Sequence, residues 1–270
     1  MSLQADFAGS KNNETLTVRF STAADAPKII DFYNAALHEH VDKRPDTVLW
    51  NRAGQGQVLM IEDSKGDLRA SSIAYEFNKT AGRDPAFLST WVEFGSTRST
   101  LSGVSLYPFI VATQVIERFL AYPPEDKFIA AIYKDNQPVT DFLNKKVGWS
   151  FFTPDAELAD ATDLTKDLGK LNCLEAASTS LPHQARIVLD YMERGTTIGL
   201  DNRKTGEKVM LDVRKLTLSK FWRSAVEEIA HGAFGKALEA GPPMPMGAAR
   251  RLLEKHLNAS ICAPQPGLKP

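Results

Sequence analysis

The chain has 270 residues, a formal net charge of −1 at pH 7, 43% hydrophobic residues and 24% charged residues. This length is enough for one large domain or two small ones, and the composition is that of an ordinary soluble globular protein. The near-zero charge gives no electrostatic reason to expect nucleic acid or an anionic membrane as a partner. No apolar run approaches the roughly 18 residues that a membrane-spanning helix needs.

The N-terminal residues 1–15 are polar and aperiodic, so we expect a flexible tail rather than a signal peptide. The two cysteines, Cys173 and Cys262, lie far apart and lack the spacing of metal ligands. Two reduced thiols in a cytoplasmic protein are the simplest interpretation, with a disulfide as the alternative. His38 and His40 are two residues apart and do not share a helix face, so we expect no metal site.

The first predicted elements are a strand, two helices and a hairpin. Residues 16–21 alternate apolar and polar side chains, which predicts a strand. A helix follows with Pro27 in its first turn, and residues 46–53 predict a second, short helix. Two strand patterns, at 57–63 and 67–77, flank a turn that contains glycine and predict a hairpin.

A further strand is predicted at Ala86–Gly95, and a Ser- and Thr-rich turn joins it to an amphipathic helix. Pro108 would clash with the carbonyl four residues before it inside a helix, so it belongs in the first turn. The helix is therefore predicted to begin near Val104 or Ser105. This start would leave the backbone amides from Ser99 to Ser105 available to a ligand.

The next strand, Lys127–Tyr133, is almost wholly apolar, as expected when both faces are buried. A helix with Pro138 near its start and Gly148 after its end follows, and WSFFT closes the series as a strand. This order predicts an α/β (α+β) fold in which helices flank a mixed central sheet of about six to seven strands.

The remaining residues, 156–270, predict a helix, a second hairpin and two more helices. We therefore divide the chain into a tail (1–15), a core domain (16–155) and a C-terminal extension (156–270). The extension covers the core, forms part of a substrate pocket, or makes a homodimer interface, and the sequence does not choose among these roles.

Two motifs give the core a family resemblance. Arg98-Ser99-Thr100-Leu101-Ser102-Gly103 matches the first and last positions of a Gln/Arg-x-x-Gly-x-Gly/Ala motif, with Leu101 at the central glycine. Further on, Asn136 opens a helix that ends in Lys146-x-Gly148-Trp149. In this element order, the two motifs resemble those of the GNAT superfamily of acyl-CoA-dependent N-acyltransferases.

The resemblance implies acetyl-CoA or another acyl-CoA as acyl donor, with no metal. Its pyrophosphate would lie at the turn before the helix, because a helix N-terminus carries unpaired amides and about +0.5 of charge. Its pantetheine arm would pair with the fourth strand, which then diverges from the fifth. The implied cofactor-binding residues are Phe94, Gly95, Ser96, Arg98, Ser99, Thr100, Leu101, Ser102, Gly103, Val104 and Asn136. The alternative is a plain N-cap at Ser102 or Ser105, with Arg98 a solvated charge.

Direct attack of an amine on a thioester needs a base and is helped by an acid near the leaving thiolate. Glu93, on the fourth strand, is the candidate base and Tyr133, at the end of the fifth, the candidate acid. The family often carries a tyrosine acid on the following helix, where this chain has Leu143 or Asn144. Tyr107 is the alternative acid.

Three functions are compatible with these residues. The first is an N-acyltransferase that moves an acyl group from acyl-CoA to an amine on a small molecule or a protein. The second is a GNAT-fold binding or regulatory protein without catalysis. The third is a synthase that takes its acyl group from acyl carrier protein and needs a basic docking surface near the cleft.

Overall fold

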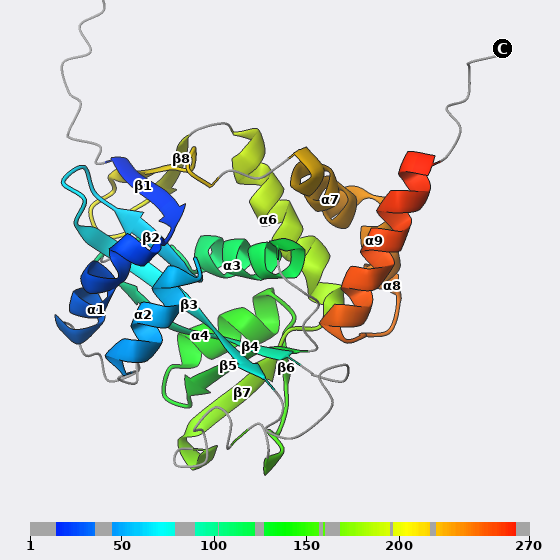
Figure 1. The fold of residues 1–270 in the computed structure, drawn as a ribbon, viewed down its shortest axis with the longest axis horizontal. Helices are drawn as coiled ribbons and strands as arrows, with labels where there is room; N and C mark the ends of the chain where they lie inside the picture. The colour runs from blue at the N-terminus through cyan, green and yellow to red at the C-terminus, as the bar shows by residue number, and fades with distance from the viewer. Residues whose placement is uncertain are drawn as a thin grey trace, which may run out of the picture.

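The computed structural model describes residues 15–35, 45–78, 90–101, 103–121, 127–156, 159, 168–194, 197–216 and 220–262. These residues form one sheet of nine strands in the order β6-β7-β5-β4-β3-β2-β1-β9-β8, with helices on both faces (Figure 1). The strands are β1 Thr15–Phe20, β2 Val58–Glu62, β3 Leu68–Asn78, β4 Thr90–Ser99, β5 Lys127–Tyr133, β6 Ser150–Phe151, β7 Leu171–Glu175, β8 Thr197–Asp201 and β9 Lys208–Asp212.

The α-helices lie between these strands and after the last of them. They are α1 Ala26–Ala35, α2 Asp46–Gly54, α3 Tyr107–Ala121, α4 Gln137–Asp141, α6 Leu181–Glu193, α7 Lys220–His231, α8 Ala233–Ala240 and α9 Met246–Cys262. One π-helical turn, Phe142–Lys146, continues α4. Within the described part of the chain, no helix combines the length and the apolar character needed to cross a membrane.

The predicted α/β fold with a mixed sheet is confirmed. β1 to β4 are antiparallel neighbours, β4 and β5 are parallel, and β7 runs antiparallel to both β5 and β6. The first six strands correspond to the predicted ones, whereas β7 lies in the extension, where the sequence pattern predicts no strand before the second hairpin. The sheet is larger than predicted because β8 and β9 also extend it beyond β1.

Two predicted boundaries are wrong by several residues. The fourth strand ends at Ser99 rather than at Gly95, and its predicted start at Ala86 lies outside the described residues. Helix α3 begins at Tyr107, not near Val104 or Ser105, so Pro108 is its second residue. The start is later because Gly103 has φ +86° and Val104 forms an isolated antiparallel bridge with Asn202, a backbone arrangement that a helix excludes.

The C-terminal extension contributes strands to both ends of the same sheet. The predicted boundary at residue 155 falls between β6 and β7, which pair with each other. At the other end β9 runs parallel to β1, with Leu16 opposite Leu211. Strands β9 and β8 cover what would otherwise be the exposed edge of β1. Covering an edge in this way commonly protects a sheet from pairing with other chains.

The sheet buries apolar side chains on both faces, which is why its central strands are so uniformly hydrophobic. On β2, Leu59 and Ile61 face the core that contains α3, whereas Val58 and Met60 face α1 and α2. All five residues of this strand are buried. Alternate residues of a strand point to opposite faces, so a strand covered on both sides needs an apolar residue at nearly every position.

Helix α3 is buried almost all round. The sequence predicted one apolar face, including Phe109, Ala112 and Ile116, and all three are buried. Ile110, Val111, Val115 and Phe119 are buried as well. The extension causes this burial, because α6 packs along α3 and α9 reaches its end (Figure 1). Arg250 of α9 donates hydrogen bonds from Nη1 to the carbonyls of Phe119, at 2.7 Å, and Leu120.

Candidate active site

The parallel strands β4 and β5 stay paired over only three residues each. The pairs are Trp91 with Lys127, Val92 with Phe128, and Glu93 with Ile129. Beyond Glu93, β4 continues to Ser99 and β5 to Tyr133 with no further pairing between them in the described structure. The backbone edges that face each other beyond this point are therefore available to another extended chain.

A bulge in β4 bends it at the place where it leaves β5. Ser71 pairs with Arg98 and Ile73 with Gly95, so β4 carries one extra residue over this interval. A bulge increases the local twist and redirects a strand, which explains the divergence. The buried Gln114 of α3 fixes the bulge from one face, because its Nε2 donates to the Ser72 carbonyl at 2.8 Å.

The turn between β4 and α3 retains fewer free amides than the sequence predicted. The Thr100 amide donates to the Arg69 carbonyl at 2.8 Å, and the Leu101 amide donates to Ser99 Oγ at 3.0 Å. These two amides are therefore used within the protein, and the expectation that all amides from Ser99 to Ser105 serve a ligand is wrong. In the first turn of α3, Pro108 has no amide hydrogen and the Ile110 amide donates to the Leu106 carbonyl at 3.0 Å, so the amides without a partner among the described residues are those of Tyr107 and Phe109.

The hairpin loop between β8 and β9 lies directly against this turn. The Arg203 amide donates to the Gly103 carbonyl at 3.0 Å, and Val104 bridges with Asn202. A Cβ on Gly103 would lie 2.4 Å from Asn202 Oδ1 and 2.9 Å from Lys204 Cγ. A glycine is thus required at position 103 for two reasons: the extension approaches too closely for a side chain, and the backbone φ is positive.

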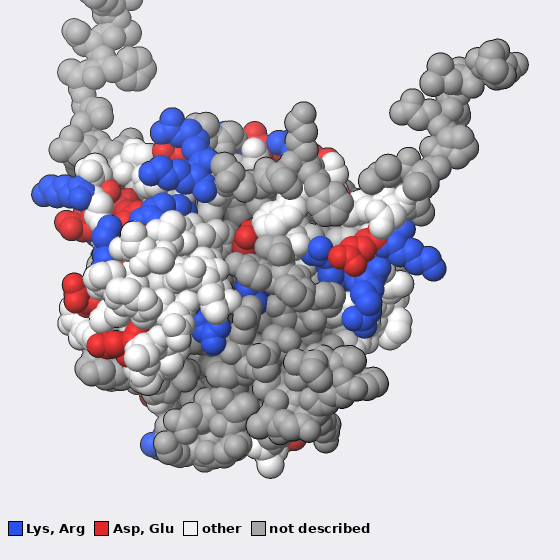
Figure 2. All heavy atoms as spheres, in the orientation of Figure 1, with Lys and Arg blue, Asp and Glu red and all other residues white. Residues whose placement is uncertain are grey.

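This loop brings positive charge to the start of α3. The loop and the strand after it carry Arg203, Lys204 and Lys208, all exposed. Figure 2 shows Lys and Arg side chains gathered over the end of the sheet where Figure 1 places β8 and β1. A helix N-terminus with neighbouring cations is a suitable environment for a phosphate group.

The described backbone places the predicted cofactor-binding residues of β4 along the diverging edge. Phe94, Gly95, Ser96 and Arg98 all follow the last pair with β5, whereas the candidate base Glu93 is itself in that pair. Ser102 lies outside the described residues. These positions make Glu93 the last β4 residue before the opening.

The two candidate acids lie in different environments. Tyr133 is partly buried and packs with Leu171 and Cys173, in a cluster separate from the α3 core. Tyr107 is the first residue of α3, and its ring meets Phe142 edge-on with 5.3 Å between centroids. Burial raises the pKa of the Tyr107 hydroxyl far above its usual value, so this group keeps its proton at neutral pH.

Neither residue at the position of the family's tyrosine can replace that hydroxyl. Leu143 is buried in the main core, and Asn144 Nδ2 donates to the Trp149 carbonyl at 2.8 Å. Asn136 does open α4, as predicted, and its backbone carbonyl accepts from the Thr140 amide at 3.2 Å. Tyr107 thus packs against the π-helical turn that contains Leu143 and Asn144.

Sequence reasoning missed the contribution of the β8–β9 loop to this site. Asn202 carries the local signal of a turn, since its Oδ1 accepts from the Lys204 amide at 2.9 Å and the Thr205 amide at 3.3 Å. That pattern predicts the hairpin but not where it docks. The only further signal is Gly103, whose missing side chain was attributed to a phosphate rather than to a neighbouring loop.

Comparisons with solved structures return GNAT acetyltransferases. An acetyltransferase of this family from Listeria monocytogenes is 14% identical over 59% of this chain and 93% of its own length, with a TM-score of 0.38. A GnaT-family acetyltransferase from Bordetella pertussis is 16% identical over 62% and 98% of the two chains, with a TM-score of 0.40.

N-acetylglutamate synthase from Neisseria gonorrhoeae, solved with coenzyme A and N-acetylglutamate, is also similar to this chain. It is 13% identical over 60% of this chain and 34% of its own, with a TM-score of 0.39. No family model and no curated protein sequence matches this chain. The element order and the divergence of β4 from β5, rather than these scores, define a divergent GNAT-like fold with a C-terminal extension.

Proposed function

We propose that the protein is an N-acyltransferase that binds acyl-CoA between β4 and β5 and transfers the acyl group to an amine. The observation that carries this proposal is the end of β4–β5 pairing at Glu93 and Ile129, although both strands continue. The pantetheine arm of coenzyme A is an extended chain with two amide groups. It is suited to the unpaired edge of β4, in the way that a peptide adds to a sheet edge.

The phosphates of coenzyme A would then lie at the start of α3. The donors there are the amides of Tyr107 and Phe109 in its first turn, together with Arg98 on β4 and the cations of the β8–β9 loop, Arg203 and Lys204. Charge-assisted bonds from arginine and lysine to phosphate are stronger than neutral ones. In this proposal the extension completes the cofactor site.

The proposed chemistry uses residues near the point where β4 separates from β5. The amine nitrogen attacks the thioester carbonyl, so a C–N bond forms and the C–S bond breaks. Glu93 takes the proton that the amine loses, directly or through water, and Tyr107 gives its proton to the departing thiolate. A backbone amide of β4 beside the carbonyl would stabilise the negative charge that develops on its oxygen.

Calorimetric titration with acetyl-CoA and longer acyl-CoAs tests the binding step. We expect saturable binding that Arg98→Glu weakens by about tenfold or more, since a charge reversal replaces an attraction to phosphate with a repulsion. Lys236→Glu, an equal charge change at an exposed position of α8, is the control and should bind normally. Absence of a signal with every acyl-CoA would refute the proposal.

Release of the coenzyme A thiol in the presence of a panel of amines tests catalysis. Glu93→Gln should retain acyl-CoA binding and lose roughly 100-fold or more in rate, the usual contribution of general base catalysis. Tyr107→Phe should slow the reaction more than Tyr133→Phe, because of the two only Tyr107 packs against Phe142, beside the position of the family's tyrosine. A larger loss of rate in Tyr133→Phe than in Tyr107→Phe would identify Tyr133 as the acid instead.

Two observations favour alternatives. The amides of Thr100 and Leu101 are already paired, and α4 carries no tyrosine, which is compatible with a GNAT-fold protein that binds acyl-CoA without transferring the acyl group. The basic β8–β9 loop is compatible with acyl carrier protein as the donor. Release of the coenzyme A thiol only in the presence of an amine would exclude the first alternative. Rates with acyl-CoA that equal or exceed the rates with acyl carrier protein would exclude the second.

A further inference from the structure

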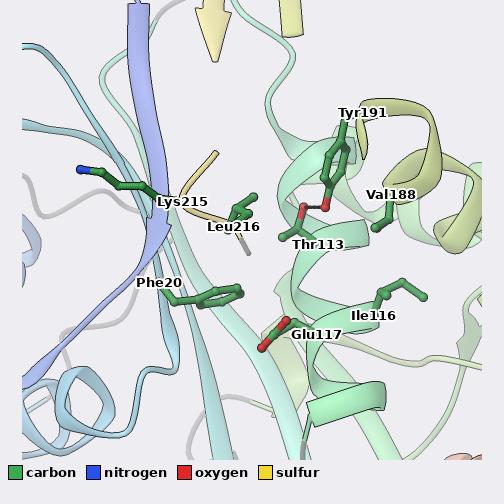
Figure 3. Close-up of a pocket in the computed structure, with 8 residues that line it drawn as sticks. All are labelled: Phe20, Thr113, Ile116, Glu117, Val188, Tyr191, Lys215 and Leu216. Atoms are coloured by element: carbon green, nitrogen blue, oxygen red, sulfur yellow. Dashed lines mark hydrogen bonds between the residues drawn. The ribbon is translucent and has the colours of Figure 1, made fainter. Parts of the chain in front are cut away.

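A second cavity lies apart from the β4–β5 opening, on the side of α3 that faces α6. It has a volume of about 260 Å³ and lies among β1, α3, α6 and the segment after β9 (Figure 3). Its lining residues are Phe20, Thr113, Ile116, Glu117, Val188, Tyr191, Lys215 and Leu216. The core domain and the extension thus build this cavity together, and the proposed acyl-CoA site uses none of these residues.

The hydroxyl groups in this cavity present acceptors rather than donors. Thr113 Oγ1 lies 2.7 Å from the Phe109 carbonyl, which can only accept, so the threonine proton is used there. Thr113 Oγ1 also lies 2.9 Å from the Tyr191 hydroxyl, drawn as a dashed line in Figure 3. Tyr191 must therefore donate its only proton to Thr113, and the remaining lone pairs of its oxygen are left for a ligand.

Glu117 adds a carboxylate to these acceptors. Among the described residues it has no hydrogen-bond or ion-pair partner, and its side chain lies between Phe20 and Ile116 in Figure 3. Burial raises its pKa to about 7, and the charge of the adjacent Arg118 opposes this shift. A carboxylate in such a position is stabilised by a cation that brings its own hydrogen-bond donors.

The remaining walls are apolar, and the one cation of the lining does not neutralise the acid. Ile116, Val188 and Leu216 provide hydrocarbon surface, while the amino group of Lys215 points away from Glu117 in Figure 3. Because a cavity of about 150 Å³ holds a benzene ring, this cavity suits a ligand of roughly ten non-hydrogen atoms. The complementary molecule has a compact apolar body and a single ammonium group.

We propose that this cavity binds a small primary amine with an apolar or aromatic body, whose ammonium group donates to Glu117 and to the Tyr191 oxygen. The proposal does not depend on acyl-CoA chemistry, because the cavity lies on a different part of α3 from the β4–β5 opening.

The test uses three probes of similar size and shape: 2-phenylethylamine, the neutral 2-phenylethanol and the anionic 3-phenylpropanoate. Calorimetric titration of the full-length protein should show the amine binding at least about tenfold more tightly than the alcohol, and the carboxylate not at all. Equal affinities for amine and alcohol would overturn the proposal, because apolar contact alone would then account for binding.

Three variants locate the site. Glu117→Gln preserves the shape of the side chain and should weaken amine binding about tenfold, with little change for the alcohol. Leu216→Trp should exclude all three probes by filling the cavity. Glu193→Gln, at an exposed position of α6, is the control and should behave as wild type. Unchanged amine binding by Glu117→Gln would overturn the proposal, even if acyl-CoA binding is observed.

The pH dependence provides an independent readout. The charged or titratable groups around Glu117 are Arg118 on α3, Tyr191 on α6 and Lys215 after β9, and burial raises the pKa of the Tyr191 hydroxyl, which therefore keeps its proton. Amine affinity should therefore rise as pH increases through about 7, as Glu117 loses its proton. Glu117→Gln should abolish this rise, and its persistence in that variant would contradict the assignment.

Discussion

Gly103→Ala is the most informative single substitution for the relation between the extension and the core. Gly103 has φ +86°, where a residue with a side chain is strained, and its carbonyl accepts from the Arg203 amide. A Cβ at this position would also lie 2.4 Å from Asn202 Oδ1, so the hairpin loop would have to move. Gly206 in the same loop has φ +72° but no atom within 4 Å of its would-be Cβ. Gly206→Ala is therefore the matched control.

The expected magnitudes follow from these two contributions. A left-handed backbone conformation costs an alanine about 1–2 kcal/mol, and both variants incur this cost. Only Gly103→Ala also displaces Asn202, whose Oδ1 accepts two backbone hydrogen bonds, each worth about 0.5–1.5 kcal/mol. These bonds are exposed, so we expect Gly103→Ala to be more destabilising than Gly206→Ala by roughly 1–2 kcal/mol.

Urea and thermal unfolding of the two variants measure this difference. For a protein of this size about 1 kcal/mol corresponds to a change of roughly 2–4 °C in Tm. Adding Asn202→Gly should recover part of the stability of Gly103→Ala and none of that of Gly206→Ala, since only a Cβ at position 103 would meet the Asn202 side chain. Equal destabilisation by the two alanine variants would show that the loop does not dock on the turn, and would refute the reasoning.

Two further substitutions test contacts at other places in the fold. Asp25→Asn removes a carboxylate that Arg19 holds with two hydrogen bonds of 2.7 Å, and it should cost about 1–3 kcal/mol at pH 7. Arg19 lowers the pKa of Asp25, so this stabilisation is present above about pH 4 and is lost as pH falls further; the difference in urea midpoint between wild type and variant should shrink accordingly. Arg250→Ala should lower Tm by several degrees, because it removes the hydrogen bonds to two carbonyls at the end of α3, whereas Arg251→Ala, at an exposed position of α9, should have little effect.

Local sequence patterns predicted most of the elements of the core. The alternation in residues 16–21, the apolar run of β5 and Pro108 near the start of α3 each reflect constraints within a few residues. The start of α3 was placed too early because Val104 pairs with Asn202. A local sequence pattern does not indicate a pairing partner as distant in the sequence as Asn202 is from Val104.

The candidate active site was predictable only in part. The order of strands and helices indicated that β4 and β5 would be parallel neighbours, and Glu93 is at the point where they separate. The pairing of Thr100 with Arg69, the packing of Leu143 and the position of Tyr107 against Phe142 depend on tertiary contacts. For this reason the sequence offered two tyrosines as acids, and the choice of Tyr107 stays a prediction for the Tyr107→Phe and Tyr133→Phe variants.

The cavity at Glu117 had no signal in the sequence. A glutamate on an amphipathic helix is usually solvated, and nothing nearby in the chain indicated burial. Helix α6 and the segment after β9 complete its lining with Val188, Tyr191, Lys215 and Leu216. The acceptor character of the cavity arises from the bond between Thr113 and Tyr191, residues from separate helices.

The amino-acid sequence by itself determined the mixed α/β fold and the succession of elements, because turn residues, prolines and the period of apolar positions act locally. Tertiary structure decided how the extension joins the core. β9 pairs with β1 because an exposed strand edge needs a partner, and α3 is buried all round because α6 and α9 also cover it. Both arrangements result from the burial of surfaces that belong to segments distant in the sequence. The local pattern of either segment does not specify its partner.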